Sequence, residues 1–130
     1  MSISIVILII VVVVVGLVLL RRGTVQRLSP DGQVIAALLK AGSDLSKPHP
    51  VEFFLYFPTT QAAEKIGGTL REEGFEVLVQ PAAQGPHFLV KATRSMVPYE
   101  SDLLSLREHL GALAEKAGGK YDGWGTSVVE

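Results

Sequence analysis

The first twenty residues differ from the rest of the chain because they are almost entirely apolar. Residues 3–20, ISIVILIIVVVVVGLVLL, carry no charged side chain, and only Ser4 and Gly16 interrupt the aliphatic run. A span of about 20 helical residues crosses a hydrocarbon core of roughly 30 Å, and a backbone in lipid must satisfy its own hydrogen bonds. The pattern therefore predicts a transmembrane helix. This predicted span includes Ile3, Ile10, Val15 and Leu20.

A cleaved signal peptide is the alternative for this segment, and it requires a basic start and a small-residue cleavage site. Met1 and Ser2 carry no side-chain charge, and residues 19–22, LLRR, are not small. We therefore expect residues 1–21 to be an uncleaved anchor. Every Lys and Arg follows the apolar run, so the positive-inside rule predicts a single-pass membrane protein whose C-terminal domain lies in the cytoplasm.

A polar stretch and an amphipathic stretch come next. Residues 22–30, RGTVQRLSP, predict a juxtamembrane linker, because they are polar and contain Gly and Pro. The following stretch has helical periodicity and ends at Gly42, so it predicts a helix over about 31–41. Its expected apolar stripe consists of Val34, Ile35, Leu38 and Leu39.

From residue 51 onward, β-rich runs alternate with helical stripes. Runs such as VEFFLYF predict strands, and a leucine stripe spaced 3, 4, 3, 4 predicts the longest helix. The order is β-α-β-β-α-β after a leading helix, which is the ferredoxin-like arrangement of an α+β domain over residues 31–130. Both later helices should cover one sheet face, and only the leading helix is available for the other. The expected strands are 51–57, 75–81, 87–94 and a short one in 120–126, and the expected helices run from Thr59 or Thr60 to about Glu73 and within 98–119.

Composition and charge narrow the chemistry. The chain has 130 residues, 12 basic and 13 acidic side chains, a formal net charge of -1 and no cysteine. The absence of cysteine fits a reducing compartment, and a net charge near zero argues against binding driven by phosphates. The three histidines have no metal-ligand spacing, and neither a nucleophile elbow nor a Gly-rich phosphate loop occurs. We expect no catalytic residue, metal or cofactor, although a Ser-His-Asp arrangement assembled by the fold stays open.

Phe54 and Tyr56 are the first candidates for a binding surface. They alternate with the core residues of the first strand, so they face the opposite side of the sheet. Exposed aromatic rings on such a face can stack on single-stranded RNA. The alternative, which we favour, is that both rings pack under the leading helix or a loop, because the third strand lacks the aromatic ladder of RNA-recognition modules.

Tyr121, Asp122, Gly123 and Trp124 are the second candidates. Asp-Gly is a strong turn or bulge pair, and Trp124 offers a large ring with one N–H donor. One interpretation is that Trp124 fills the end of the core and Asp122 caps a local turn. The other is that the segment is a protein-binding tip, because Trp and Tyr are enriched in interface hot spots.

Several blocks of the chain together resemble the regulator of ribonuclease E activity B family, over about residues 30–128. The similarity rests on VEFFLYFPTTQAAEKIGGTLREEGFEV, TRSMVP and GGKYDGWGT. Members of this family are small ferredoxin-like proteins that bind an RNA-degrading endonuclease and reduce its cleavage of transcripts. The resemblance therefore implies a protein-binding regulator rather than an enzyme, with a protein partner in preference to direct nucleic acid. The blocks that carry the resemblance are Phe54–Pro58, Gly74–Val77, Thr93–Pro98 and Tyr121–Trp124.

Two departures from the family pattern bear on function. The soluble members lack an N-terminal membrane span, and they are more acidic than this chain. An anchored, near-neutral relative can keep the fold and take a different partner.

Overall fold

The structure, a computed structural model, describes residues 28–130. The predicted anchor, and all but the last three residues of the predicted linker, lie outside this range. Within it, the elements follow in the order predicted, a leading helix and then β-α-β-β-α-β, and no helix here combines the length and apolar character needed to cross a membrane. The elements are α2 (Pro30–Lys40), β1 (His49–Phe57), α3 (Thr60–Glu72), β2 (Glu76–Pro81), β3 (Phe88–Met96), α4 (Glu100–Lys116) and β4 (Lys120–Gly125).

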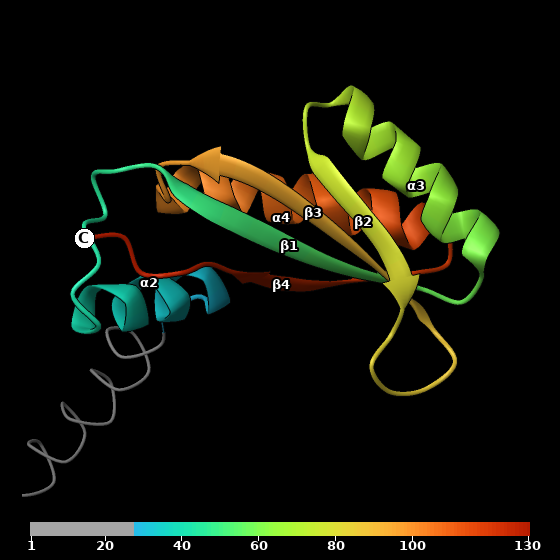
Figure 1. The fold of residues 1–130 in the computed structure, drawn as a ribbon, viewed down its shortest axis with the longest axis horizontal. Helices are drawn as coiled ribbons and strands as arrows, with labels where there is room; N and C mark the ends of the chain where they lie inside the picture. The colour runs from blue at the N-terminus through green and yellow to red at the C-terminus, as the bar shows by residue number, and fades with distance from the viewer. Residues whose placement is uncertain (1–27) are drawn as a thin grey trace, which may run out of the picture.

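The four strands form one antiparallel sheet in the order β2-β3-β1-β4 (Figure 1). Strand β1 lies between β3 and β4 and pairs with both, while β2 pairs with β3 at the other edge. The two β-α-β halves are thus interleaved, as in split β-α-β folds. The predicted α+β domain with an antiparallel sheet is confirmed.

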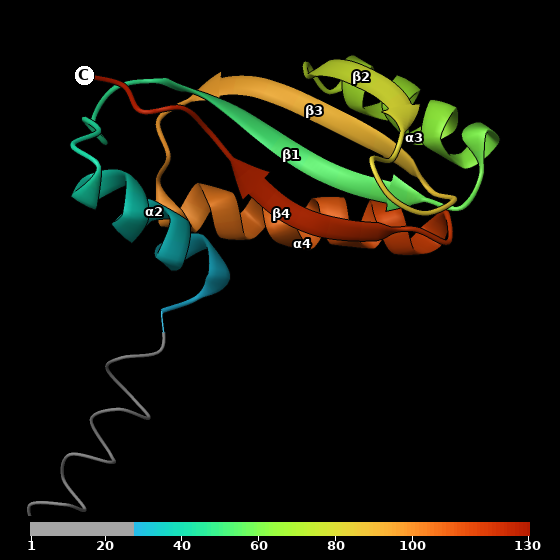
Figure 2. The same cartoon turned by 60° about the horizontal axis from the view of Figure 1, so that its bottom comes forward.

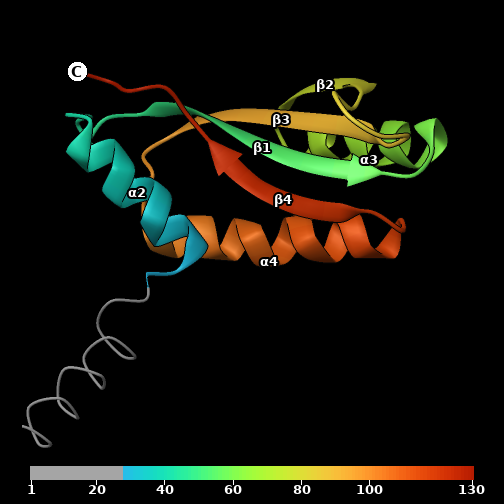
Figure 3. The same ribbon diagram turned by 90° about the horizontal axis from the view of Figure 1, so that it is seen from below.

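The core lies between the sheet and the two later helices. Figures 2 and 3 show α3 and α4 on the same side of the sheet. Along β1, Val51, Phe53, Leu55 and Phe57 are fully buried, and the residues between them are partly exposed. The Phe53 and Phe75 rings pack in a T-shaped arrangement, with 5.8 Å between the ring centroids. Helices α3 and α4 contribute further core side chains, namely Ala63, Ile66, Leu70, Leu103, Leu110 and Ala114.

Helix α2 packs at one end of the domain, against α4 and β4, and not across the second face of the sheet (Figure 3). Leu38 is buried and Val34 and Ile35 pack against the core, but Leu39 is 64% exposed. The predicted stripe is therefore wrong at Leu39, because α2 touches its neighbours along a narrower strip. Within residues 28–130, no helix covers the second face of the sheet, which we call the open face.

Alanine substitutions at Gly67 and Gly68 in α3 are expected to change the free energy of unfolding in opposite directions. A Cβ added at Gly67 would lie 3.2 Å from Val79 Cγ2 and 3.3 Å from Val77 Cγ1, whereas Gly68 has open space around it. Close packing on the sheet therefore explains Gly67 but not Gly68. We expect Gly68→Ala to raise the free energy of unfolding by about 0.5–1 kcal/mol, and Gly67→Ala to lower it by about 1 kcal/mol through overpacking. Urea denaturation of both variants measures this, and shifts of the same sign would contradict the packing account.

Candidate functional site

Strand β4 carries the predicted Tyr121–Trp124 segment and contains a bulge. Trp124 pairs with Phe53 and Tyr121 with Leu55, so two residues of β4 lie opposite the single residue Phe54. The extra residue is accommodated at Gly123, whose φ of +96° favours glycine. In a regular strand, residues three apart face opposite sides. The bulge turns both Tyr121 and Trp124 toward the helices.

The indole of Trp124 is 7% exposed and belongs to a buried polar network. Its Nε1 donates a hydrogen bond to Asp31 Oδ1 at 3.1 Å. Arg107 donates to the same carboxylate through Nη2, at 2.8 Å from Oδ1, and through Nε, at 3.1 Å from Oδ2. Helices α2 and α4 and strand β4 therefore meet at one carboxylate, and these hydrogen bonds raise the pKa of the Arg107 guanidinium. This arrangement agrees with the core interpretation of Trp124.

Tyr121 lies half-buried beside this network. The Arg107 guanidinium carbon is 5.4 Å from the centroid of its ring, within the range of a cation–π interaction. The hydroxyl oxygen is buried and has no hydrogen-bond partner among residues 28–130. Burial raises the pKa of Tyr121 to about 12, although the charge of Arg107 opposes this shift. At neutral pH the side chain is therefore an uncharged packing element.

The raised pKa of Tyr121 predicts a loss of stability in alkali. The pKa of Tyr121 in the folded protein, about 12, exceeds the usual value of about 10. The stability that depends on a neutral Tyr121 is therefore complete below pH 10 and is lost as the pH rises toward 12. We expect Tyr121→Phe to lose less stability than the parent between these pH values. At pH 7 the variant should match or slightly exceed the parent, because it removes an unpartnered hydroxyl. Denaturation midpoints measured across this range test both points, and parallel curves would contradict them.

Phe54 and Tyr56 lie on the open face, as the alternation along the strand predicts. The favoured interpretation that they pack under the leading helix is wrong, because α2 packs against α4 and β4. The partners of Phe54 and Tyr56 in the sheet are Lys91 and Leu89 of β3. Lys91 Nζ is 3.1 Å from Glu52 Oε2, so this lysine is already paired with a carboxylate. The open face thus presents two half-exposed aromatic rings beside aliphatic side chains and one ion pair.

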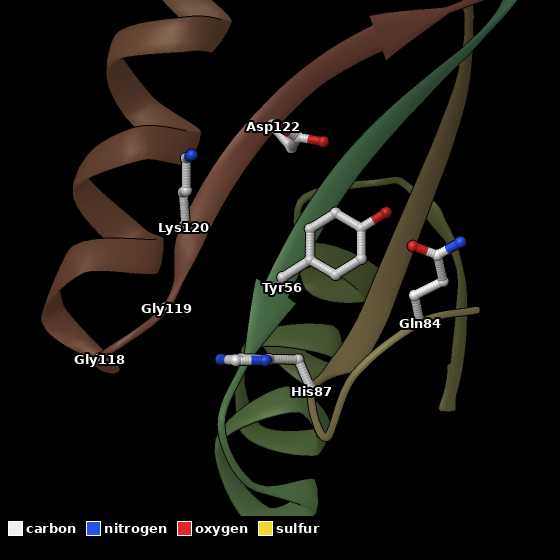
Figure 4. A pocket seen from close by; sticks show the side chains of 7 residues that line it. All are labelled: Tyr56, Gln84, His87, Gly118, Gly119, Lys120 and Asp122. Atoms are coloured by element: carbon white, nitrogen blue, oxygen red, sulfur yellow. The ribbon is translucent and has the colours of Figure 1, made fainter. Parts of the chain in front are cut away.

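A shallow cavity of about 340 Å³ lies at one end of the open face. Figure 4 shows the Tyr56 ring projecting into it between Gln84 and strand β4, with His87 beside the ring. Lys120 and Asp122 bring opposite charges to its rim, so it suits contacts with mixed polar groups. The lining residues are Tyr56, Gln84, His87, Gly118, Gly119, Lys120 and Asp122.

A buried Ser-His pair joins the C-terminal residues to the loop before β1. His49 is fully buried, with Nδ1 at 2.7 Å from the Lys47 carbonyl oxygen and Nε2 at 2.6 Å from Ser43 Oγ. Ser43 Oγ also accepts a hydrogen bond from the Val129 N–H at 3.0 Å. Because both side chains are inaccessible and their polar atoms are occupied, this pair holds the fold together and offers no nucleophile.

The other two histidines are far from this pair. His87 lies in the loop before β3, not in the strand as predicted, and His109 on α4 contacts Glu73 Oε1 at 2.7 Å. Residues 28–130 contain no group of three His, Cys, Asp or Glu side chains that could hold a metal ion.

The predicted site residues divide between the two faces of the sheet. Phe54, Tyr56 and the exposed Asp122 share the open face or its rim, whereas Tyr121 and Trp124 lie on the helix side. The sequence pattern does not reveal Asp31 and Arg107 as partners of Trp124. Asp31 resembles an ordinary acidic residue in the first turn of a helix, so no local signal reveals its buried role.

The fold and its exposed sheet face define a small α+β domain with a surface suited to binding. The family described as Regulator of ribonuclease activity B matches residues 29–126, which include every helix and strand described above. The chain therefore belongs to this family, which is a family of regulators and is not known as one of enzymes. No curated protein matches the chain.

Proposed function

We propose that this protein is a membrane-anchored regulator that binds an RNA-degrading endonuclease and reduces its cleavage of transcripts. The observation that carries the proposal is the family match over residues 29–126. The family description supplies the regulation of ribonuclease activity, and the resemblance noted above supplies the endonuclease as partner.

The proposal includes an anchor formed by residues 1–21, with the domain on the cytoplasmic side of the membrane. It is supported by the uncharged run of residues 3–20 and by the position of every Lys and Arg after that run. Helix α2 begins at Pro30, nine positions after residue 21, so the linker between the proposed anchor and the domain is short. Such an anchor would restrict the regulator to endonuclease molecules at the membrane.

For the partner-binding surface, we favour the open face and the β4 bulge. Phe54, Tyr56 and Asp122 offer the contacts, because they are at least partly exposed. Tyr121, Gly123 and Trp124 act indirectly in this proposal, since they set the shape of the bulge that presents Asp122. Aromatic rings flanked by polar groups are typical of protein-protein contacts.

The test uses the full-length protein purified in lipid nanodiscs. We expect it to retain the endonuclease from membranes of the source cell, identified by mass spectrometry, and to slow transcript cleavage by the purified enzyme. A Tyr56→Ala/Asp122→Lys variant should retain its fold and bind more weakly. Recovery of other membrane proteins with no ribonuclease, together with unchanged cleavage, would overturn the proposed function.

Direct binding of single-stranded RNA through Phe54 and Tyr56 is the second candidate function. It is favoured by one observation, the absence of α2 from the open face. It predicts that the full-length protein shifts single-stranded RNA, that added salt weakens the complex, and that Tyr56→Ala abolishes it. The absence of any shift with the parent protein would reject it.

A further inference from the structure

A second surface lies between α3 and α4, on the side of the sheet away from the open face. There the two helices border a groove of about 380 Å³. Its floor is apolar, formed by Ala62, Ile66, Leu113 and Ala117, and only Ile66 and Leu113 are large. The α3 side extends from Gln61 to Thr69, which at about 1.5 Å per residue gives roughly 12 Å, or two helical turns.

The rim of this groove is basic. Lys65 on α3 and Lys116 on α4 are both exposed and line it, whereas none of the lining residues is acidic. Neither lysine forms an ion pair within residues 28–130. Neither lysine has an acidic neighbour on the same face of its helix, since no Asp or Glu lies three or four positions from it. On a chain with a net charge of -1, two unpaired lysines beside an apolar floor form a distinct local feature.

We propose that this groove docks an amphipathic helix of a protein partner, with apolar side chains on the floor and carboxylates paired with Lys65 and Lys116. Charge complementarity selects the occupant, because an acidic flank gains two ion pairs where a basic flank meets two like charges. A short helix that lays an apolar stripe into such a groove is a recurrent mode of peptide recognition. An RNA strand fits poorly, since no aromatic ring lines the groove for base stacking.

The groove and the open face lie on opposite sides of the sheet, so a partner that engages both must extend around the domain, with its acidic helix separate from its main contact surface. The assignment of this helix to the endonuclease rests on the proposed function, whereas the chemistry of the groove does not.

The experiment measures binding to the full-length protein in nanodiscs of zwitterionic lipid. The probes are the purified endonuclease and a labelled helical peptide of about five turns, with a leucine stripe flanked by glutamates. A second peptide carries lysines in place of the glutamates. We expect the glutamate peptide to bind saturably and the lysine peptide not to bind. The double variant Lys65→Glu/Lys116→Glu should lower the affinity for the glutamate peptide and the affinity for the endonuclease by about tenfold each.

Lys40→Glu is the matched control, because Lys40 is an exposed lysine on α2 and its reversal changes the charge as much as either single variant. It should leave both affinities unchanged, while Lys65→Glu and Lys116→Glu should each weaken them. If both probes bind the parent and the double variant equally, the groove proposal is overturned and the proposed function stands. If only the endonuclease is unaffected, the groove stands and its assignment to the endonuclease is overturned. If the endonuclease does not bind but the glutamate peptide does, and the double variant abolishes this, the groove stands and the proposed function falls. Failure of both probes overturns the groove as well.

Discussion

Replacing Trp124 with alanine is expected to lower the free energy of unfolding by about 3–5 kcal/mol. The indole is buried opposite Phe53, and its removal would open a cavity where β4 meets α2 and α4. The substitution would also deprive the buried Asp31 carboxylate of one of its donors. Trp124 is the only tryptophan in the chain, so urea unfolding of this variant must be followed by circular dichroism.

Trp124→Phe is the matched control, because it keeps an aromatic ring in the core and removes only part of the volume and the N–H group. Its loss should be clearly smaller than that of the alanine variant, about 1–2 kcal/mol. A Trp124→Ala protein with parental stability that has lost its partner would show that the ring is a binding tip. Equal losses for the two variants would mean that the hydrogen bond to Asp31 dominates over packing.

The position of Trp124 changes how the Tyr121–Trp124 segment should be viewed. Trp124 lies in the core, Tyr121 is half-buried against it, and Asp122 is the exposed charged member of the segment. The segment therefore shapes the bulge through Trp124 and Gly123 and exposes Asp122 on it. Substitutions at Trp124 would mix both effects, so Asp122 and Tyr56 are better probes of binding.

The helices and strands could be predicted because their signals are local. In β1, strict alternation separates Phe53 and Leu55 from Phe54 and Tyr56, and this period depends only on strand geometry. In α3, Thr59 accepts a hydrogen bond from the Ala62 N–H, as expected of an N-cap, and Gly74 follows its end with a φ of +96°. Each of these features depends only on residues that are close in sequence, so it can be predicted before the fold is known.

The polar networks could not be predicted, because they join residues that are distant in sequence. Asp31 lies 76 positions from Arg107 and 93 from Trp124. The Ser43 hydroxyl meets the Val129 backbone 86 positions away. None of these contacts leaves a period or a motif in the sequence, since each depends on how complete elements pack together.

The placement of α2 was mispredicted for a related reason. Its apolar stripe indicated a covering helix but not which surface it would cover. The buried carboxylate of Asp31, at the start of α2, forms an ion pair with Arg107 on α4, on the helix side of the sheet. This contact favours the end of the domain over the open face, and it leaves Leu39 exposed and the open face uncovered.

Removing Asp31 and removing Arg107 are expected to have unequal effects on stability, because the two side chains are buried to different extents. The Asp31 side chain is 2% exposed and the Arg107 side chain 31% exposed. Among residues 28–130, Arg107→Ala would leave the buried Asp31 carboxylate with only the Trp124 N–H as donor, at a cost of about 3–4 kcal/mol. Asp31→Ala should cost less, about 2 kcal/mol, because the freed guanidinium can turn toward water.

The Asp31→Ala/Arg107→Ala double variant distinguishes charge pairing from packing as the cause of these losses. Because an unpaired buried charge is worse than none, Asp31→Ala/Arg107→Ala should be more stable than Arg107→Ala alone, and the single losses should not add. Urea denaturation of the parent and the three variants measures these differences. Additive losses would show that Asp31 and Arg107 contribute independently, and that packing and not charge pairing fixes α2 to the domain.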